Sequence, residues 1–213
     1  SRAYIPQSIC GEMKKYMIET LPAIKMGDVT DFRNLMNAVI DEKSFDNIMS
    51  YIEKAKNAPD AEIMFGGNGD KSKGYFIEPT IIHTTNPEFI TMQEELFGPV
   101  ITMYVYEDNK YEETLELCNN TSPYALTGSI FGTCRYAVNT AFDKLRYAAG
   151  NFYINDKPTG AVVGMQPFGG ARGSGTNDKA GSHLNLLRWV NPRTIKETLV
   201  PPTDYTYPFM SEE

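Results

Sequence analysis

Apolar residues recur at helical spacing near the start of the chain. They occupy positions Ile9, Met13, Tyr16, Met17 and Leu21. This spacing predicts an amphipathic helix that ends at Leu21–Pro22. A second helix is predicted over residues 44–58, because Ser44 can cap it and Pro59 ends it. The apolar side chains that would form its buried face are Phe45, Ile48, Met49 and Ile52.

From residue 61 the pattern changes to short apolar runs of the kind found in strands. Strands are predicted at 61–65, 75–77, 80–82, 99–106, 127–131 and 151–154, with helices at 111–119 and 135–145. Strands that alternate with helices through short connections indicate parallel βαβ units. The sequence therefore predicts an α/β protein built on a layered, parallel sheet.

The end of the chain has a different texture. Residues 159–181 are rich in glycine and form a long irregular segment, and such loops in compact domains are usually functional or disordered. A strand is predicted over 194–200, stopped by Pro201–Pro202 and followed by an aromatic tail. An exposed strand with such a tail needs a sheet edge or a partner to cover it, which favours oligomerisation.

Composition places the chain among globular proteins that do not bind nucleic acid. Its 213 residues are 41% hydrophobic and 22% charged, enough for one domain with a sizeable core. Twenty basic against 27 acidic residues give a net charge of −7, which offers no attractive field for nucleic acid or anionic lipid. Three cysteines without a CxxC pair predict free thiols in a reducing compartment.

Several common sites are not predicted. The chain has neither a G-x-G-x-x-G turn nor a P-loop, and residues 66–70 are interpreted as a hairpin tip. His83 and His183 lie in different elements without further ligands at suitable spacing, so no zinc site is expected. The cysteines lie within or beside apolar helical patterns and are predicted to be inert, buried thiols.

The strongest local signal is the segment Gln93–Val100, where two glutamates and an aromatic precede a Gly-Pro break and a buried strand. A rigid turn would hold Glu95 and Phe97. A carboxylate there can accept two hydrogen bonds from a ribose diol, and an aromatic face can pack on a flat ring. The plainer alternative is a solvated glutamate pair beside a core phenylalanine.

The second signal is the loop that follows the last predicted βαβ strand. Its glycines expose backbone N–H groups that can hold an anion, and Gly160 with Ala161 leaves room for a carboxylate to approach. Phe168, just before Gly169–Gly170, could wall an apolar pocket. The alternative is an ordinary flexible surface loop.

Taken together, these motifs resemble a known family. Residues 94–99, the run 124–130, and the segment 166–175 with its Phe168-Gly169-Gly170 stand in the order found in NAD(P)-dependent aldehyde dehydrogenases. The resemblance covers essentially the whole chain. Residues 155–179 and the Leu187-Arg188-Trp189 segment are most similar to the 1-pyrroline-5-carboxylate (glutamate-γ-semialdehyde) dehydrogenases.

The resemblance implies roles for five residues. Glu95 matches the glutamate that holds the nicotinamide ribose, and Phe97 the aromatic beside the nicotinamide. Gly160 and Ala161 match the loop whose backbone N–H groups bind the substrate carboxylate. Some relatives carry serine at the position of Ala161, so only the backbone contact is expected here. Phe168 matches an aromatic that lines the aldehyde passage.

The resemblance also implies what kind of piece this is. In the family, the nucleophilic cysteine lies a few residues before the segment matching Ser1, and the phosphate-binding turn and the water-activating glutamate lie further upstream. Residues 1–189 are therefore expected to be the carboxyl-terminal catalytic domain and residues 190–213 an oligomerisation strand and tail, without the Rossmann domain. No residue of this chain, Cys10 included, is expected to be catalytic, and the isolated chain is expected to be inactive.

For the full-length protein, the resemblance implies an enzyme of proline catabolism in the mitochondrial matrix. It would attack glutamate-γ-semialdehyde with a cysteine thiolate, transfer hydride to NAD⁺ and hydrolyse the thioester to glutamate, as a homo-oligomer and with neither metal nor membrane. NAD is the expected cofactor, although the residue that selects against NADP would lie upstream. Two alternatives remain open: a dehydrogenase for another acidic semialdehyde, and a catalytically dead scaffold of the same fold.

Overall fold

The computed structural model describes residues 1–210. Its α-helices are α1 (Gln7–Thr20), α2 (Glu42–Lys56), α3 (Ile90–Gln93), α4 (Tyr111–Asn120), α5 (Arg135–Lys144) and α6 (His183–Leu186). Its strands are β1 (Arg2–Pro6), β2 (Ala61–Phe65), β3 (Gly69–Asp70), β4 (Phe76–Ile77), β5 (Thr80–Thr84), β6 (Val100–Tyr106), β7 (Tyr124–Ala125), β8 (Thr127–Ile130), β9 (Asn151–Ile154) and β10 (Ala171–Arg172). Short 3₁₀ helices are η1 (Leu21–Ala23), η2 (Asp108–Lys110), η3 (Leu187–Trp189) and η4 (Pro208–Met210).

A four-stranded sheet forms the centre of the molecule, in the order β1-β6-β5-β2. Strand β6 lies parallel to both β1 and β5, with Ala3 opposite Met103 and Ile81 opposite Ile101, whereas β2 runs antiparallel to β5. The parallel α/β architecture predicted from the sequence is confirmed.

Helix α2 supplies the main apolar core of this sheet. Its Ile48 and Ile52 are fully buried and pack with Ile82 and Val100 from the strands. The N-terminal cap is Asp41, whose Oδ1 accepts a hydrogen bond from the Ser44 backbone N–H at 2.7 Å. The prediction that Ser44 caps this helix is therefore wrong: Ser44 supplies the donor, and the helix begins two residues earlier.

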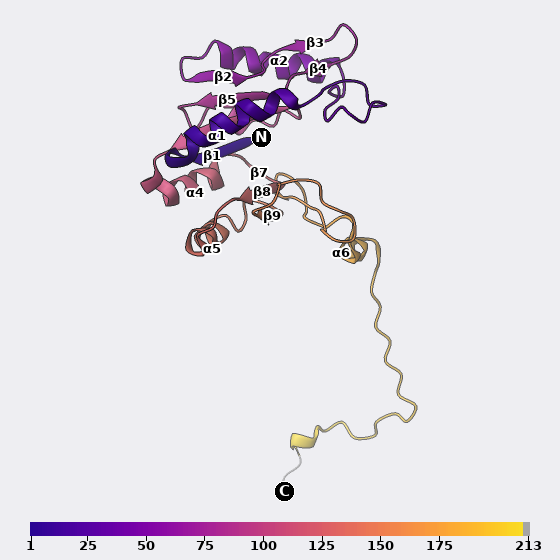
Figure 1. The fold of residues 1–213 in the computed structure, drawn as a ribbon. Helices are drawn as coiled ribbons and strands as arrows, with labels where there is room; N and C mark the ends of the chain where they lie inside the picture. The colour runs from indigo at the N-terminus through magenta and orange to yellow at the C-terminus, as the bar shows by residue number, and fades with distance from the viewer. Residues whose placement is uncertain (211–213) are drawn as a thin grey trace.

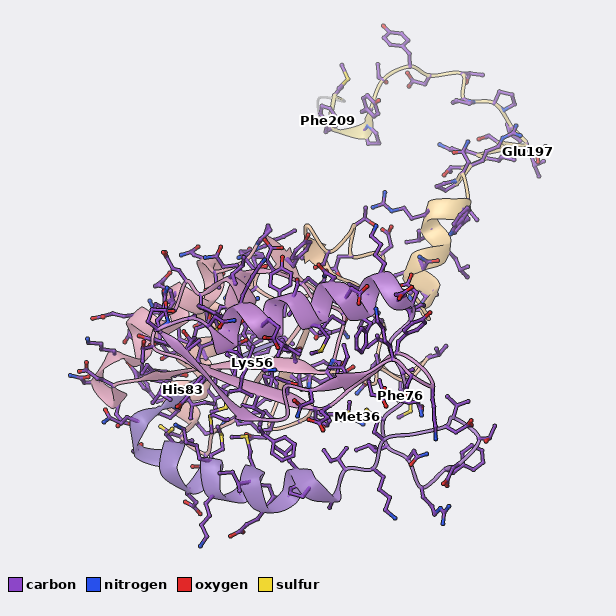
Figure 2. All side chains as sticks on the ribbon, turned by 90° about the horizontal axis from the view of Figure 1, so that it is seen from above. Met36, Lys56, Phe76, His83, Glu197 and Phe209 are labelled. Atoms are coloured by element: carbon purple, nitrogen blue, oxygen red, sulfur yellow. The ribbon has the colours of Figure 1, made fainter. Side chains whose placement is uncertain are left out.

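Helix α1 lies on the face of the sheet opposite α2 (Figure 2). Its start is held by Asp108, whose Oδ2 accepts from the Ser8 backbone N–H at 3.2 Å. Cys10 is the buried side chain of this helix, while Ile9, Tyr16 and Ile18 are exposed. The predicted amphipathic helix is present: on its apolar face Met13, Met17 and Leu21 are half-buried, whereas Ile9 and Tyr16 are exposed.

The second half of the βαβ pattern forms its own small sheet. Strands β8 and β9 pair in parallel and are joined by α5. Helices α4 and α5 pack through Leu115 and Ala141, together with Leu145 directly after α5. Because no described residue of β6 pairs with β8, this unit does not extend the four-stranded sheet.

The chain after η3 leaves the body as an extended arm (Figure 1), on which Glu197 and Phe209 are labelled in Figure 2. The strand predicted over 194–200 is not formed within residues 1–210, because no other strand lies beside it to accept its backbone hydrogen bonds. Ile195, Leu199 and Val200 are exposed. Within residues 1–210, no helix combines the length and the apolar character needed to cross a membrane.

Candidate functional site

The turn between α3 and β6 presents an aromatic ring to the surface. Leu96 is buried, whereas the next residue, Phe97, is 82% exposed and has a φ of +52°. A non-glycine residue in this left-handed region is uncommon and is held there by its surroundings. The alternative of a core phenylalanine is wrong: Leu96 takes the core position, and the turn directs Phe97 outward.

Helix α2 and strand β5 hold this turn in place. A Cβ at Gly98 would lie 2.5 Å from the Cδ1 atom of Ile48, so α2 packs directly on the glycine backbone. The carbonyl oxygen of Pro99 accepts from the Thr80 backbone N–H at 2.8 Å. The path of the chain after Phe97 is therefore fixed by the core.

The carboxylate of Glu95 is exposed on the same turn. Within residues 1–210 it forms neither a hydrogen bond nor an ion pair, so its oxygens are available to a ligand. The start of the chain lies next to this turn: the carbonyl oxygen of Ser1 accepts from the Thr102 backbone N–H at 2.9 Å. The Ser1 nitrogen lies 3.2 Å from the Val100 carbonyl oxygen.

The loop after β9 carries the second set of predicted residues. Gly160 is exposed and has a φ of +76°, a backbone conformation that residues other than glycine rarely adopt. Ala161 is half-buried. The side chain of Lys157 folds over Gly160, with its Nζ 3.4 Å from the place that a Cβ at residue 160 would occupy. The Lys157 ammonium group therefore lies beside the backbone of Gly160.

Phe168 is half-buried and its backbone is fixed on both sides. Its N–H donates to the Ala180 carbonyl oxygen at 3.0 Å, in an isolated antiparallel bridge. On the other side, the Asn151 side chain bonds the carbonyl oxygen of Pro167 and the N–H of Gly169, each at 3.1 Å. Three hydrogen bonds therefore tie the main chain around Phe168 to Asn151 and to Ala180.

Two basic side chains tie the glycine-rich segment to the rest of the fold. Arg172 donates through Nη1 to the carbonyl oxygen of Asn119 and through Nη2 to its Oδ1, both at 2.6 Å, at the end of α4. Lys179 donates through Nζ to the carbonyl oxygen of Gly150 at 2.6 Å.

With this geometry in place, comparison with known proteins identifies the family. Residues 1–195 match the sequence pattern of the aldehyde dehydrogenase family. The chain belongs to the aldehyde dehydrogenase family.

Individual relatives narrow the resemblance within the aldehyde dehydrogenases. Mitochondrial delta-1-pyrroline-5-carboxylate dehydrogenase of Dictyostelium discoideum is 63% identical over 210 residues, covering 99% of this chain and 38% of that protein. The protein of the same name from Homo sapiens is 49% identical, with the same coverage of both chains. The crystal structure of the Mycobacterium tuberculosis delta-pyrroline-5-carboxylate dehydrogenase bound with NAD has a TM-score of 0.84, at 49% identity over 99% of this chain and 38% of its own. This chain thus spans about two fifths of the length of these aldehyde dehydrogenases.

The five residues to which the family resemblance assigns binding roles lie on two different parts of the chain. Glu95 and Phe97 belong to the turn before β6, whereas Gly160, Ala161 and Phe168 belong to the segment after β9. No hydrogen bond or ion pair within residues 1–210 joins the two sets. Shallow depressions of about 330 and 420 Å³ lie elsewhere, beside Tyr104 and beside Leu21, and none of the five residues lines them.

Two residues that contact the predicted site residues, Lys157 and Asn151, were not identified from the sequence. Lys157 stands three residues before Gly160 in the chain, and only the fold of the loop brings its ammonium group back over the glycine. Asn151 begins a predicted strand, where an asparagine is uncommon. That departure from strand preference was the signal available for Asn151, whereas Lys157 gave none.

The cysteines and histidines complete the set of reactive groups. Burial raises the pKa of the Cys118 thiol, so it is protonated near neutral pH and a poor nucleophile. Cys10 is buried, but Cys134 is exposed, so its predicted burial is wrong. Cys134 precedes the first turn of α5, where its side chain faces away from the core. The Nδ1 atom of His83 lies 2.9 Å from Oε1 of Glu62. Within residues 1–210, no group of three His, Cys, Asp or Glu side chains is placed to hold a metal ion.

Proposed function

We propose that this chain is the carboxyl-terminal catalytic part of an NAD-dependent 1-pyrroline-5-carboxylate dehydrogenase, which oxidises glutamate-γ-semialdehyde to glutamate in proline catabolism. The observation that carries the proposal is the 63% identity, over 99% of the chain, to a relative of that name. Relatives named mitochondrial support a location in the mitochondrial matrix.

The turn before β6 fits a dinucleotide. Glu95 offers an unpaired, exposed carboxylate that can accept both hydroxyls of a ribose, and Phe97 offers an exposed ring face to the nicotinamide. When bound, NAD⁺ supplies the hydride acceptor for the aldehyde carbon. Because α2 and β5 fix the turn, Glu95 and Phe97 orient the cofactor without first having to be ordered.

The loop after β9 fits the acidic end of the substrate. The backbone N–H groups of Gly160 and Ala161 donate hydrogen bonds to the carboxylate, and the Lys157 ammonium adds an opposite charge beside Gly160. The positive φ of Gly160 turns the chain without a side chain in the way. Phe168 lines the apolar part of the passage and contacts any aldehyde, charged or not.

The groups that make and break bonds lie outside this chain in the proposal. A nucleophilic cysteine a few residues before Ser1 would be within reach of the turn, because each residue spans at most about 3.5 Å and Ser1 lies beside Val100. The water-activating glutamate and the phosphate-binding turn belong further upstream. The residues described here orient the cofactor and anchor the substrate, so the isolated chain has no dehydrogenase activity.

The last part of the chain serves assembly in this proposal. Residues 1–189 form the catalytic domain, and residues 190–213 supply an oligomerisation strand and a tail. The arm exposes Ile195, Leu199 and Val200, and a strand with such side chains is stable only when paired and covered. A homo-oligomer of at least two copies provides both. Removing residues 190–213 from the full-length protein should therefore lower its mass in solution to that of the monomer.

The experiment that tests the function uses the full-length protein. NADH formation is measured with glutamate semialdehyde, with succinate semialdehyde and with an uncharged aldehyde of similar length. A marked preference for glutamate semialdehyde supports the proposal. A preference for another acidic aldehyde would replace the substrate, and a folded, NAD-free and inactive protein would favour the scaffold alternative. Aldehyde-dependent NADH formation by the isolated chain would overturn the roles assigned to its residues.

A pair of glycine variants tests the carboxylate anchor. Gly160→Val should raise the KM for glutamate semialdehyde about tenfold and leave uncharged aldehydes nearly unaffected, because only the acidic substrate uses the anchor. Gly164→Val is the matched control, since Gly164 has a similar φ of +82° in the same loop but no atom within 4 Å of its would-be Cβ. Ala161→Ser should be tolerated. Equal losses for charged and uncharged aldehydes would indicate a general folding defect instead.

A further inference from the structure

The side chain of Asn151 holds the main chain on both sides of Phe168. Its Nδ2 donates to the Pro167 carbonyl oxygen and its Oδ1 accepts from the Gly169 N–H, each at 3.1 Å. Its own backbone is fixed in the β8–β9 pair, where the Asn151 N–H donates to the Leu126 carbonyl oxygen at 3.0 Å. The two bonds therefore connect a rigid strand to the segment that carries Phe168.

We infer that Asn151 is a positioning residue that sets the Phe168 ring in the aldehyde passage. The inference rests on the function proposed for Phe168. A planar carboxamide has both a donor and an acceptor, so it pairs with one C=O and one N–H of a neighbouring extended segment, as a strand does. Aspartate lacks the donor and alanine lacks both groups, so neither provides the same two contacts.

Two further contacts hold the backbone of residues 167–169. On the side away from Asn151, the Phe168 N–H donates to the Ala180 carbonyl oxygen at 3.0 Å. A Cβ at Gly150 would lie 1.9 Å from the Gly169 carbonyl oxygen, so the start of β9 and this segment touch backbone to backbone. With its main chain held from two sides, Phe168 has only side-chain torsions left to set the direction of its ring.

The test is a double-mutant cycle in the full-length protein, with Asn151→Ala, Phe168→Ala and the double variant. Asn151→Ala should lower kcat/KM about tenfold for acidic and uncharged aldehydes alike, because both pass the ring; effects of this size are common between residues in contact. In the Phe168→Ala background the same change should cost less than about twofold. This lack of additivity is the result that a merely structural role of Asn151 would not produce.

Asn86→Ala is the control, since Asn86 is also half-buried and bonded through both amide atoms, to Asp60 Oδ2 and to the Glu88 N–H, each at 2.9 Å, but lies after β5. It should destabilise the protein without changing the aldehyde kinetics. If Asn151→Ala melts below the assay temperature, Asn151→Asp, which keeps the acceptor for Gly169, takes its place in the cycle.

The outcomes separate the inference from the proposed function. Equal losses from the Asn151 change in both backgrounds would overturn the positioning role while leaving Phe168 in the passage. A folded Phe168→Ala variant with unchanged kinetics for every aldehyde would remove Phe168 from the site, and with it the basis of the inference. A large loss that disappears in the Phe168→Ala background supports both.

Discussion

The four-stranded sheet and the glycine-rich segment after β9 are stabilised in different ways. The sheet depends on apolar burial: α2 places Ile48 and Ile52 against the strands with no exposed surface. The glycine-rich segment buries little. It is held by side chains that bond the main chain, from Asn151, Arg172 and Lys179, and by the backbone contact of Gly150 with Gly169.

The two kinds of interaction have different effects on the fold. Burial of apolar side chains stabilises a fold in proportion to the area removed from water and has no preferred direction. Polar bonds to the main chain contribute less free energy, but they fix one backbone path and leave other N–H groups free for a ligand. Stability is thus concentrated in the sheet, and the shape of the glycine-rich segment is set by a few polar side chains.

The two regions meet at helix α4. On the sheet side, the hydroxyls of Tyr4 and Thr121 lie 2.7 Å apart. On the other side, Arg172 bonds Asn119 at the end of the same helix. Glu95 and Phe97 stand on the apolar region and Gly160, Ala161 and Phe168 on the polar one. The following variants measure how separate the two regions are.

The largest effect is expected in the apolar region. Ile48→Ala should destabilise the full-length protein by about 2–5 kcal/mol, because it leaves a cavity in a fully packed site. Since Ile48 also supports Gly98, the turn bearing Phe97 should loosen as well. The free energy of unfolding from urea titration measures the loss. The same deletion at Ile40, which is 90% exposed, is the control, and an equal cost at both positions would contradict the assigned core.

The next effect concerns cofactor orientation on the turn. Glu95→Gln should lower the hydride-transfer rate about tenfold with little change in melting temperature, because hydrogen bonds to a charged acceptor exceed neutral ones by roughly 1 kcal/mol. Single-turnover NADH absorbance measures this rate. The neighbouring exposed carboxylate provides the matched variant, Glu94→Gln, which should behave as the unmodified protein. Equal rates for both variants would make Glu95 an ordinary solvated residue.

A smaller effect is expected in the polar region. Lys157→Met should raise the KM for glutamate semialdehyde about threefold, since an exposed charge contributes modestly and is screened by salt. The increase should shrink at high ionic strength and be absent for uncharged aldehydes. Lys73→Met, in the turn between β3 and β4, serves as the control. A loss that is the same for every aldehyde would show that Lys157 does not face the carboxylate.

The smallest effect tests the junction at α4. Burial raises the pKa of both the Cys118 thiol and the Tyr4 hydroxyl above their ordinary values. The folded state therefore holds these protons more tightly than the unfolded state does. The stabilisation that results is fully present at pH values below the pKa of the unfolded chain, and it is lost as the pH rises through the pKa of the folded chain. Melting temperatures at pH 8 and pH 10.5 should show a steeper fall for the unmodified protein than for Cys118→Ala, by about 1–2 °C. Parallel falls would mean that the pKa of the Cys118 thiol is not raised in the folded protein.

The sheet could be predicted from the sequence more completely than the site. Helices over 44–58 and 135–145 and the strand over 99–106 follow from periodicity, because each has one apolar face or is apolar throughout. Periodicity failed where a partner decides the structure. The run 194–200 has strand character, but a strand needs a neighbour, and residues 1–210 provide none.

The site residues were found through motifs, not through pattern. Phe97 illustrates the limit of a hydrophobic pattern. Its hydrophobicity favours a core position, but the turn buries Leu96 and exposes Phe97. Lys157 and Asn151 depend on distances across the loop that no local pattern contains. The roles of Glu95, Phe97, Gly160, Ala161 and Phe168 stay predictions, and the variants above test all of them except the role of Phe97.

The register of the central sheet has a consequence for biosynthesis. Strand β1 pairs with β6, so Arg2 meets Thr102 about a hundred positions later in the chain. A ribosome adds about 5–20 residues per second, which leaves the first strand without its neighbour for roughly 5–20 seconds. During that interval the backbone groups of Tyr4 and Ile5 that pair with β6 lack this partner. Chaperone binding to this segment is therefore expected to end once β6 has left the exit tunnel.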